Sequence, residues 1–294
     1  MSGYEYGQKV PMENESMVRT LDAQARAIWP QEKDLLRRVL PRPGFDVLDV
    51  GCGTGEISTR LVDEFLPKHV TGIDIAETHI RLAKERYGGL AGLSFQHGDA
   101  TRMPFEDNRF DVAICRHMLQ AVPDPMAVIQ EMIRVTRPGG WLYTLAEDYG
   151  MLFFHPTQFD TDEFFGVYGG KASAKAESDL RQGRKMPAIL ASLGCVDIEA
   201  HYLCVDTLRV DRNLMAEILI HWRDGFEEWI SKNSGFSLED VRMRFNDMIE
   251  CTRRENGYSL WLVPCVSARV TSEAKSKLAI GSEILTGDQG LKTG

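Results

Sequence analysis

The chain has 294 residues, 43% of them hydrophobic, and a formal net charge of −9. This length fits one large domain, or one domain with an insertion, and the hydrophobic fraction is enough to fill its core. The negative charge disfavours a nucleic-acid partner, which usually requires a basic face. No apolar run reaches the roughly 18 residues of a membrane span, no secretory signal is seen, and the six cysteines form no C-x-x-C pair. We therefore expect a cytoplasmic protein with reduced thiols, no disulfide framework and no metal site.

Two helical segments are expected at the N-terminus. Glu13–Ala27 and Gln31–Leu40 have helical periodicity, and Trp29-Pro30 separates them. Residues 1–43 are therefore predicted to form an N-terminal helical lid in front of the core.

A strand, a glycine turn and a helix follow between Val47 and Phe65. The stretch VLDVGCGTGE carries glycine at every second turn position, so the turn exposes backbone N–H groups to a nucleotide-like ligand. The dinucleotide fingerprint G-x-G-x-x-G places its third glycine one residue later than Gly55. Asp49, near the end of the strand, would place its negative charge close to a pyrophosphate, which is unfavourable. It suits a ligand that carries an ammonium or sulfonium group instead, as S-adenosylmethionine (SAM) does.

Four more core strands are expected along the next hundred residues. The end of strand two carries Asp74, whose carboxylate is placed to accept both hydroxyls of a ribose. Asp124-Pro125 begins a helix as N-cap and first residue, and Arg137–Gly140 ends it. The strands are predicted at Gly72–Ile75, Leu93–Gln96, Phe110–Cys115 and Trp141–Leu145.

The glycine turn resembles motif I of class I SAM-dependent methyltransferases. The stretch MPFEDNRFDVAICRHMLQAVPDPMAVIQEMIRVTRPGG closely resembles the subfamily that includes ubiquinone and menaquinone biosynthesis methyltransferases (methyltransferase type 11 domain). The resemblance covers roughly residues 44–146, about a third of the chain. It implies an α/β fold with a Rossmann-like, doubly wound, seven-stranded sheet whose strand seven is antiparallel. It also implies SAM as the cofactor, covered by the N-terminal lid.

The resemblance assigns roles to individual residues around this cofactor. In the family, an Asp at the position of Asp99 approaches the adenine amino group, and the backbone at Arg116 touches the methionine moiety. Lid residues Tyr6, Arg19 and Gln24 are candidates to close over the methionine end, although Arg19 also fits a solvated helix position. The expected cofactor-binding residues are Asp49, Gly51, Cys52, Gly53, Asp74, Ile75, Asp99, Ala100, Arg116, Tyr6, Arg19 and Gln24.

The second half of the chain departs from the family pattern. A helix is expected over Ser178–Leu193, strand six over Val196–Val205 and strand seven over Gly257–Val266. The family joins these last two strands by a short turn, whereas here about 50 residues with two helical segments, Leu214–Ile230 and Leu238–Arg254, intervene. Insertions at this point commonly form a cap over the substrate pocket. The predicted units are a lid at 1–43, a SAM-binding methyltransferase core at 44–207, a helical cap insertion at 208–256, a last core strand at 257–271 and a flexible tail at 272–294.

Candidate catalytic groups follow strands four and five, because ligands of doubly wound sheets bind at the carboxyl ends of the strands. His117 is a candidate general base, and it also fits a histidine packed on the next helix. Glu147 or Asp148 is placed to orient an amine or hydroxyl, or to deprotonate a phenol, and Asp148 equally fits the start of a turn. His155 is a further candidate, or merely precedes a proline. The aromatic stretch after strand five fits a flat apolar substrate and fits core packing as well.

The predicted function is SAM-dependent methyl transfer to an O, N or C atom of a small molecule. The Asn/Asp-Pro-Pro-Tyr motif of nucleic-acid and protein amide methyltransferases is missing after strand four. An NAD-dependent oxidoreductase on a similar sheet, and a non-catalytic SAM- or S-adenosylhomocysteine-binding regulator, remain as alternatives. An exposed cap helix also offers a surface for homodimer formation.

Overall fold

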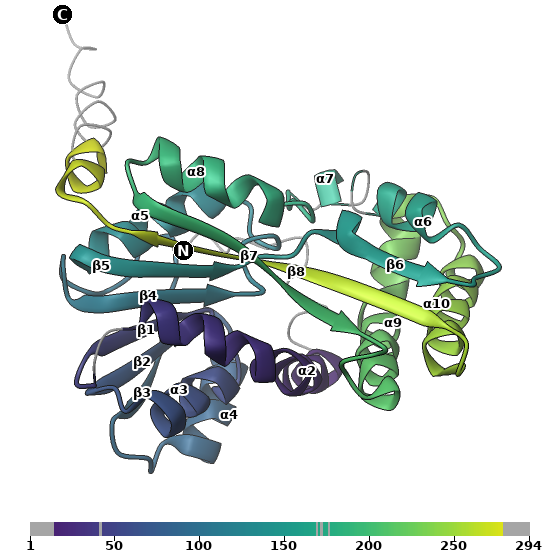
Figure 1. The fold of residues 1–294 in the computed structure, drawn as a ribbon, viewed down its shortest axis with the longest axis horizontal. Helices are drawn as coiled ribbons and strands as arrows, with labels where there is room; N and C mark the ends of the chain where they lie inside the picture. The colour runs from purple at the N-terminus through teal and green to yellow at the C-terminus, as the bar shows by residue number, and fades with distance from the viewer. Residues whose placement is uncertain (1–14, 41–42, 169, 171–172, 176, 279–294) are drawn as a thin grey trace, which may run out of the picture.

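The structure, a computed structural model, describes residues 15–40, 43–168, 170, 173–175 and 177–278. Figure 1 shows one twisted sheet with helices on both faces and a helical region at one end. The strands are β1 (Asp46–Val50), β2 (His69–Asp74), β3 (Leu93–His97), β4 (Phe110–Arg116), β5 (Thr136–Leu145), β6 (Leu152–His155), β7 (Val196–Asp206) and β8 (Tyr258–Arg269). The helices are α2 (Glu15–Val39), α3 (Glu56–Phe65), α4 (Glu77–Tyr87), α5 (Pro125–Val135), α6 (Thr161–Val167), α7 (Ser173–Lys175), α8 (Met186–Ser192), α9 (Arg212–Ser234) and α10 (Leu238–Arg253), with 3-10 turns η1 (Tyr149–Met151) and η3 (Gly183–Lys185).

The sheet confirms the predicted doubly wound fold. Its order is β3-β2-β1-β4-β5-β8-β6, and β7 pairs with the other edge of β8. Strands β1 to β5 are parallel, whereas β8 runs antiparallel to β5, β6 and β7. The predicted strands six and seven are therefore β7 and β8, and the expected antiparallel strand is confirmed.

The sheet has one strand more than the predicted seven. Strand β8 extends beyond β5. Strand β5 pairs only with the second half of β8, and β6 pairs with the first half of β8, where Leu152 lies opposite Trp261. The short β6 thus satisfies the backbone groups that β5 leaves open on the same side of β8. Sequence reasoning left residues 151–156 unassigned because a four-residue segment has too little periodicity to identify.

Alternate residues of the central strands enter two separate hydrophobic clusters. In β4, Val112 and Ile114 belong to the cluster that also contains α2 and α3, whereas Ala113 and Cys115 belong to the cluster that contains α5 and α8. A parallel strand covered on both faces is apolar at successive positions, which is why these strands appear in the sequence as short continuous apolar runs.

Three predicted boundaries are wrong. The two predicted lid helices are the single helix α2, with Pro30 inside it, and the helix changes direction along its length (Figure 1). A proline removes one backbone hydrogen bond and bends a helix without ending it when packing holds both halves. The predicted helix over 178–193 begins only at Met186, because Pro187 is tolerated only in a first turn. Strand β5 begins at Thr136, five residues earlier than expected, with an irregular register against β4.

The C-terminal segment is ordered further than predicted. Residues 272–278 are helical. Ala274 is buried in the hydrophobic cluster that also contains α8, and the Thr271 hydroxyl accepts a hydrogen bond from the backbone N–H of Ala274. Residues 279–294 of the predicted flexible tail lie outside the described residues.

The helices α9 and α10 correspond to the two helical segments predicted between the last strands. Asp211 caps α9 by accepting from two backbone N–H groups, Gly235 ends it in the left-handed conformation, and Ser237 and Asp240 form a capping box on α10. Buried residues of both helices join the cluster that contains α2. This helical region is therefore packed against the lid helix as well as against the sheet.

All six cysteines are free. Within the described ranges, no helix has the length and apolar character that crossing a membrane requires.

Polar contacts tie α2 to β4, α9 and β7, in addition to those it makes with Glu64 of α3. The Arg116 guanidinium at the end of β4 donates to both carboxylate oxygens of Glu32, each over 2.6 Å, and both side chains are almost completely buried. Arg26 pairs with Glu217 of α9 at 2.9 Å, and the Gln31 amide bonds both backbone groups of Cys204 in β7. The buried pair is the contact that fixes α2 to the parallel part of the sheet.

We expect Glu32→Ala to lower the free energy of unfolding by about 3–5 kcal/mol, because it leaves the Arg116 charge buried without its partner. Asp34→Ala is the matched control on the same helix. Asp34 is exposed and pairs with Arg37 at the surface, so its loss should change stability by less than about 1 kcal/mol.

Urea unfolding monitored by circular dichroism measures both variants. The double replacement of Glu32 by Leu and Arg116 by Met should recover much of the loss, since no unpaired charge remains. Equal stability of the Glu32→Ala and Asp34→Ala variants would contradict this role of the ion pair.

Candidate functional site

The glycine turn after β1 has a backbone that only glycine fits. Gly51, Gly53 and Gly55 have φ values of +72°, +53° and +88°. A Cβ atom on Gly51 would lie 2.6 Å from the Met118 sulfur, and one on Gly53 would lie 2.9 Å from a methyl of Leu21. Gly55 is the N-cap of α3, so the third glycine comes early because it turns the chain directly into the helix.

Asp74, at the end of β2, stabilises this turn through hydrogen bonds to the backbone. Its carboxylate accepts the Gly53 N–H and the Ala76 N–H, each at 2.8 Å. His79 lies 3.9 Å from the same carboxylate. At the end of β3, one oxygen of Asp99 accepts from both the N–H and the hydroxyl of Thr101.

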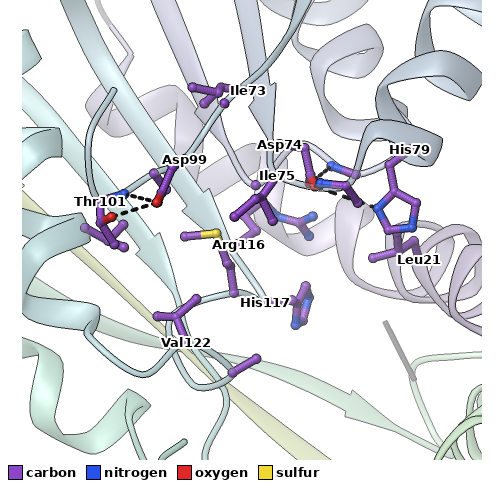
Figure 2. Close-up of a pocket in the computed structure, with 18 residues that line it drawn as sticks. Leu21, Ile73, Asp74, Ile75, His79, Asp99, Thr101, Arg116, His117 and Val122 are labelled. Carbon is purple, nitrogen blue, oxygen red and sulfur yellow. Dashed lines mark hydrogen bonds and ion pairs between the residues drawn. The ribbon is translucent and has the colours of Figure 1, made fainter. Parts of the chain in front are cut away.

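These carboxylates border a pocket that we name the Asp74 chamber. Figure 2 shows Asp74, His79 and Leu21 on one side of it, Asp99 and Thr101 on the other, and Arg116 and His117 between them. The pocket is open to solvent at its mouth. Its lining is Leu21, Gly51, Gly53, Ile73, Asp74, Ile75, Ala76, His79, Gly98, Asp99, Ala100, Thr101, Arg116, His117, Met118, Ala121, Val122 and Val128.

A second pocket, the Asp49 chamber, lies on the other side of the turn. Asp49 is almost completely buried, and the Ser58 hydroxyl donates to it at 2.6 Å. Burial raises the pKa of Asp49 to about 6, although the Ser58 hydrogen bond and the Arg116 charge act to lower it. The lining is Leu21, Gln24, Asp49, Gly51, Cys52, Gly53, Thr54, Glu56, Ile57, Arg116 and His117.

Arg116 borders both chambers but its guanidinium is engaged with Glu32. Burial acts to lower the pKa of Arg116, and the Glu32 carboxylate outweighs it and raises the pKa above its ordinary value. The side chain therefore stays charged and fixed to the lid helix.

A third pocket, the Glu147 chamber, lies beyond the ends of β4 and β5. It is bounded by α2, the segment after β5, α6 and α9, so it joins parts of the chain that lie far apart in the sequence. Its lining is Thr20, Leu21, Gln24, His117, Gln120, Ala121, Glu147, Tyr149, Tyr168, Leu180, Trp222 and Phe226.

His117 lines all three chambers. It follows β4 with a φ of +53°, a conformation that costs energy in a non-glycine residue and is frequent at functional sites. Its Nδ1 lies 2.9 Å from Glu147 Oε1, and both side chains are less than 10% exposed. His117 Nε2 and Glu147 Oε2 are buried and have no hydrogen-bond partner among the described residues.

Helix α2 supplies the wall that the chambers share. Leu21 lines all three, and Gln24, one turn later and buried, lines the Asp49 and Glu147 chambers. Arg19 is exposed and is absent from these linings. Tyr6 lies outside the described residues.

Two of the predicted catalytic residues lie elsewhere. Asp148 is fully buried, pairs with Arg184 and caps η1, which is the turn-starting alternative considered for it. His155 is exposed at the end of β6. Neither residue lines any of the three chambers. In the described part of the chain, no cluster of His, Cys, Asp or Glu side chains is arranged to hold a metal ion.

Sequence reasoning missed the residues that come from distant elements. Leu21 lies one helical turn before Gln24, so the candidate Gln24 was itself a signal for it. Glu32, Tyr168, Trp222 and Phe226 reach the site only through the packing of α2, α6 and α9, and no local pattern marks them.

Comparison with known proteins agrees with this geometry. A family model described as a methyltransferase domain matches residues 41–179. The demethylmenaquinone methyltransferase of Listeria welshimeri is 40% identical over 117 residues, which are 39% of this chain and 49% of the relative. The chain thus spans about half the length of this curated relative.

Solved structures share the fold at low sequence identity. A phosphoethanolamine N-methyltransferase 2 of Haemonchus contortus, solved with S-adenosylhomocysteine, has a TM-score of 0.57 at 18% identity, covering 92% of this chain and 61% of that one. The [4+2]-cyclase SpnF has a TM-score of 0.53 at 22% identity, covering 90% and 97%. The fold is therefore common to methyltransferases and to a protein named for another reaction.

The match over residues 41–179, the strand order with β8 antiparallel to its neighbours and the left-handed glycine turn after β1 agree: this segment is similar to a methyltransferase domain, and the chain has the Rossmann-like fold of class I methyltransferases.

Proposed function

We propose that the protein is a SAM-dependent methyltransferase that acts on a small molecule. The observation that carries this proposal is the meeting of three chambers at one residue, His117, at the carboxyl edge of the sheet. Two chambers flank the glycine turn, as a cofactor site requires, and the third provides a separate place for an acceptor. Ligands of doubly wound sheets bind at this edge.

The residues of the first two chambers fit SAM. The glycines leave no Cβ atoms in the cradle, and no Lys or Arg other than the paired Arg116 lines either chamber, so a pyrophosphate would meet no free cation. In this proposal Asp74 accepts from the ribose hydroxyls, Asp99 lies near the adenine amino group, and Asp49 lies on the side of the ammonium and sulfonium. These contacts favour SAM over NAD, and the methyltransferase domain match gives no support to an oxidoreductase.

The cofactor, when bound, supplies an activated methyl group. The protein's own contribution is to hold the acceptor in line and to exclude water. The Glu147 chamber is enclosed by α2 and α9, with Leu21, Trp222 and Phe226 as apolar walls, which supports roles as lid and cap for residues 1–43 and 208–256. Oxygen or nitrogen is the favoured acceptor atom over carbon, because polar acid–base groups line this chamber.

The presence of the separate Glu147 chamber also favours catalysis over a purely regulatory role. A regulator that only senses SAM has no need for a second pocket with unpartnered polar atoms beside the cofactor. A cytoplasmic setting, homodimer formation and the absence of nucleic-acid partners stay predictions from the sequence.

We expect Asp74→Ala to weaken SAM binding at least tenfold, because it removes both the ribose acceptor and the bond that holds the Gly53 N–H. Isothermal titration with SAM, S-adenosylhomocysteine and NAD measures this. Glu77→Gln, an exposed carboxylate three residues away, is the matched control and should bind normally. Unchanged SAM affinity in the Asp74→Ala variant would refute this site assignment, and tight NAD binding by the unaltered protein would refute the cofactor.

SAM affinity should fall as the pH drops through 6. The pKa of Asp49 in the ligand-free protein is about 6, so at pH 5 most molecules hold a proton there that a cationic ligand must displace. Binding should therefore be about tenfold weaker at pH 5 than at pH 7.5, with proton release at the lower pH. Titrations in buffers of different ionisation enthalpy measure that release. Asp49→Asn should bind weakly at both pH values, and a retained pH dependence in this variant would show that another group is responsible.

A further inference from the structure

We propose that His117 and Glu147 form an acid–base dyad that deprotonates a hydroxyl group of an uncharged acceptor, such as a phenol, in the Glu147 chamber. This inference rests on the proposed function and specifies its acceptor.

The dyad is already assembled in the structure. Glu147 Oε1 holds His117 Nδ1 at 2.9 Å, which leaves Nε2 as the nitrogen available to take a proton. The ring of His117 packs against Trp261 at 5.8 Å between centroids, and its backbone N–H donates to the Leu145 carbonyl at 2.8 Å. The imidazole is thus held in one place between the cofactor chambers and the acceptor chamber.

The buried Nε2 has no partner among the described residues. A buried polar atom without a hydrogen bond is costly, so such an atom commonly marks a place where a ligand or water binds. A hydroxyl in the Glu147 chamber would supply the missing hydrogen bond, and this hydrogen bond is also the path for its proton.

Tyr149 also lines the chamber, and its environment excludes it as the base. Burial and the nearby Glu147 carboxylate raise the pKa of Tyr149 well above its ordinary value, and the same two causes raise that of Tyr168. Both phenols therefore stay protonated. The base is therefore His117.

The charge of the chamber selects the acceptor. Its lining contains one carboxylate, Glu147, and no Lys or Arg. A phosphate or carboxylate on the substrate would meet no counter-charge in this buried space, which is unfavourable. An ammonium would be attracted to the Glu147 carboxylate, but one oxygen of that carboxylate already holds His117 Nδ1 at 2.9 Å. Tyr149 also offers a cation no open aromatic face, because it stacks with Phe165 and Tyr168 at interplanar angles of 23° and 28°. An uncharged hydroxyl compound fits best.

The reaction balances with SAM as the only co-substrate. The hydroxyl proton moves to His117 Nε2, and the imidazolium is stabilised by Glu147. The oxygen lone pair forms a bond to the methyl carbon while the carbon–sulfur bond breaks and its electron pair stays on sulfur. The products are a methyl ether, S-adenosylhomocysteine and a proton that leaves His117 for solvent.

Phenols of graded acidity test the dyad. 4-Methoxyphenol and the more acidic 4-cyanophenol serve as neutral probes, benzylamine as the cationic probe and 4-hydroxybenzoate as the anionic one, with S-adenosylhomocysteine formation as the readout. Neutral phenols should be preferred at least tenfold over both charged probes. His117→Gln should lower kcat about 10²–10⁴-fold for 4-methoxyphenol, and less for 4-cyanophenol, which needs less help to ionise, while KM changes little.

The chain offers a matched control pair on its surface. His201 lies 3.1 Å from Glu199 on β7, in the same arrangement of residue types but partly exposed. His201→Gln should leave kcat unchanged for every probe, and Glu147→Gln should reproduce the acidity-dependent loss of His117→Gln. An equal loss for both phenols in the His117→Gln variant would mean a merely structural role and would overturn the proposal.

Binding gives a readout that does not depend on turnover. In the S-adenosylhomocysteine-loaded protein, the imidazole signal of His117, assigned with the His117→Gln variant, should move when a neutral phenol is added and stay with 4-hydroxybenzoate. No movement with either phenol, or a preference for a charged probe, would overturn the dyad. If phenols move the signal but SAM does not bind, the proposed function fails while the hydroxyl site stands.

Discussion

The buried ion pair between Arg116 and Glu32 is the contact on which the arrangement of the site depends. Two charges are taken out of water in this pair, so its geometry must be close to ideal, and both Arg116 donors reach Glu32 at 2.6 Å. The pair fixes α2 across the ends of the parallel strands. Because Leu21 and Gln24 lie on that helix, their place in the chamber walls follows from a contact made more than one helical turn away.

Two neighbouring residues at the end of β4 make contacts with different parts of the chain. Arg116 turns to the lid helix, and His117, in the left-handed conformation, turns to the segment after β5, where it meets Glu147. A residue in an ordinary strand conformation would instead continue along the direction of β4. The backbone strain at His117 is thus offset by the hydrogen bonds and packing around it, and it places one imidazole at the junction of all three chambers.

The part of the molecule that departs from the common sheet forms the walls of the Glu147 chamber. The long β8 extends beyond β5, β6 pairs with that extension, and the helices α6, α9 and α10 pack there with many aromatic contacts, among them Trp222 with Trp261 and Phe164 with Phe245 (Figure 1). This packing supplies Tyr168, Trp222 and Phe226 to the Glu147 chamber. The half of the chain after β5 therefore shapes the Glu147 chamber, while the half before it shapes the Asp49 and Asp74 chambers.

The sequence by itself determined the features that depend on local order. The glycine turn, the acidic residues at the ends of β1, β2 and β3, and the order of the core strands all follow from short patterns whose meaning does not change with distant packing. Only the tertiary structure decided four other features. Helix α2 is unbroken, β6 joins the sheet, His117 pairs with Glu147, and Asp148 pairs with Arg184. Each of these joins segments that lie far apart along the chain, and the free energy that selects such contacts comes from burial, which no local sequence pattern records.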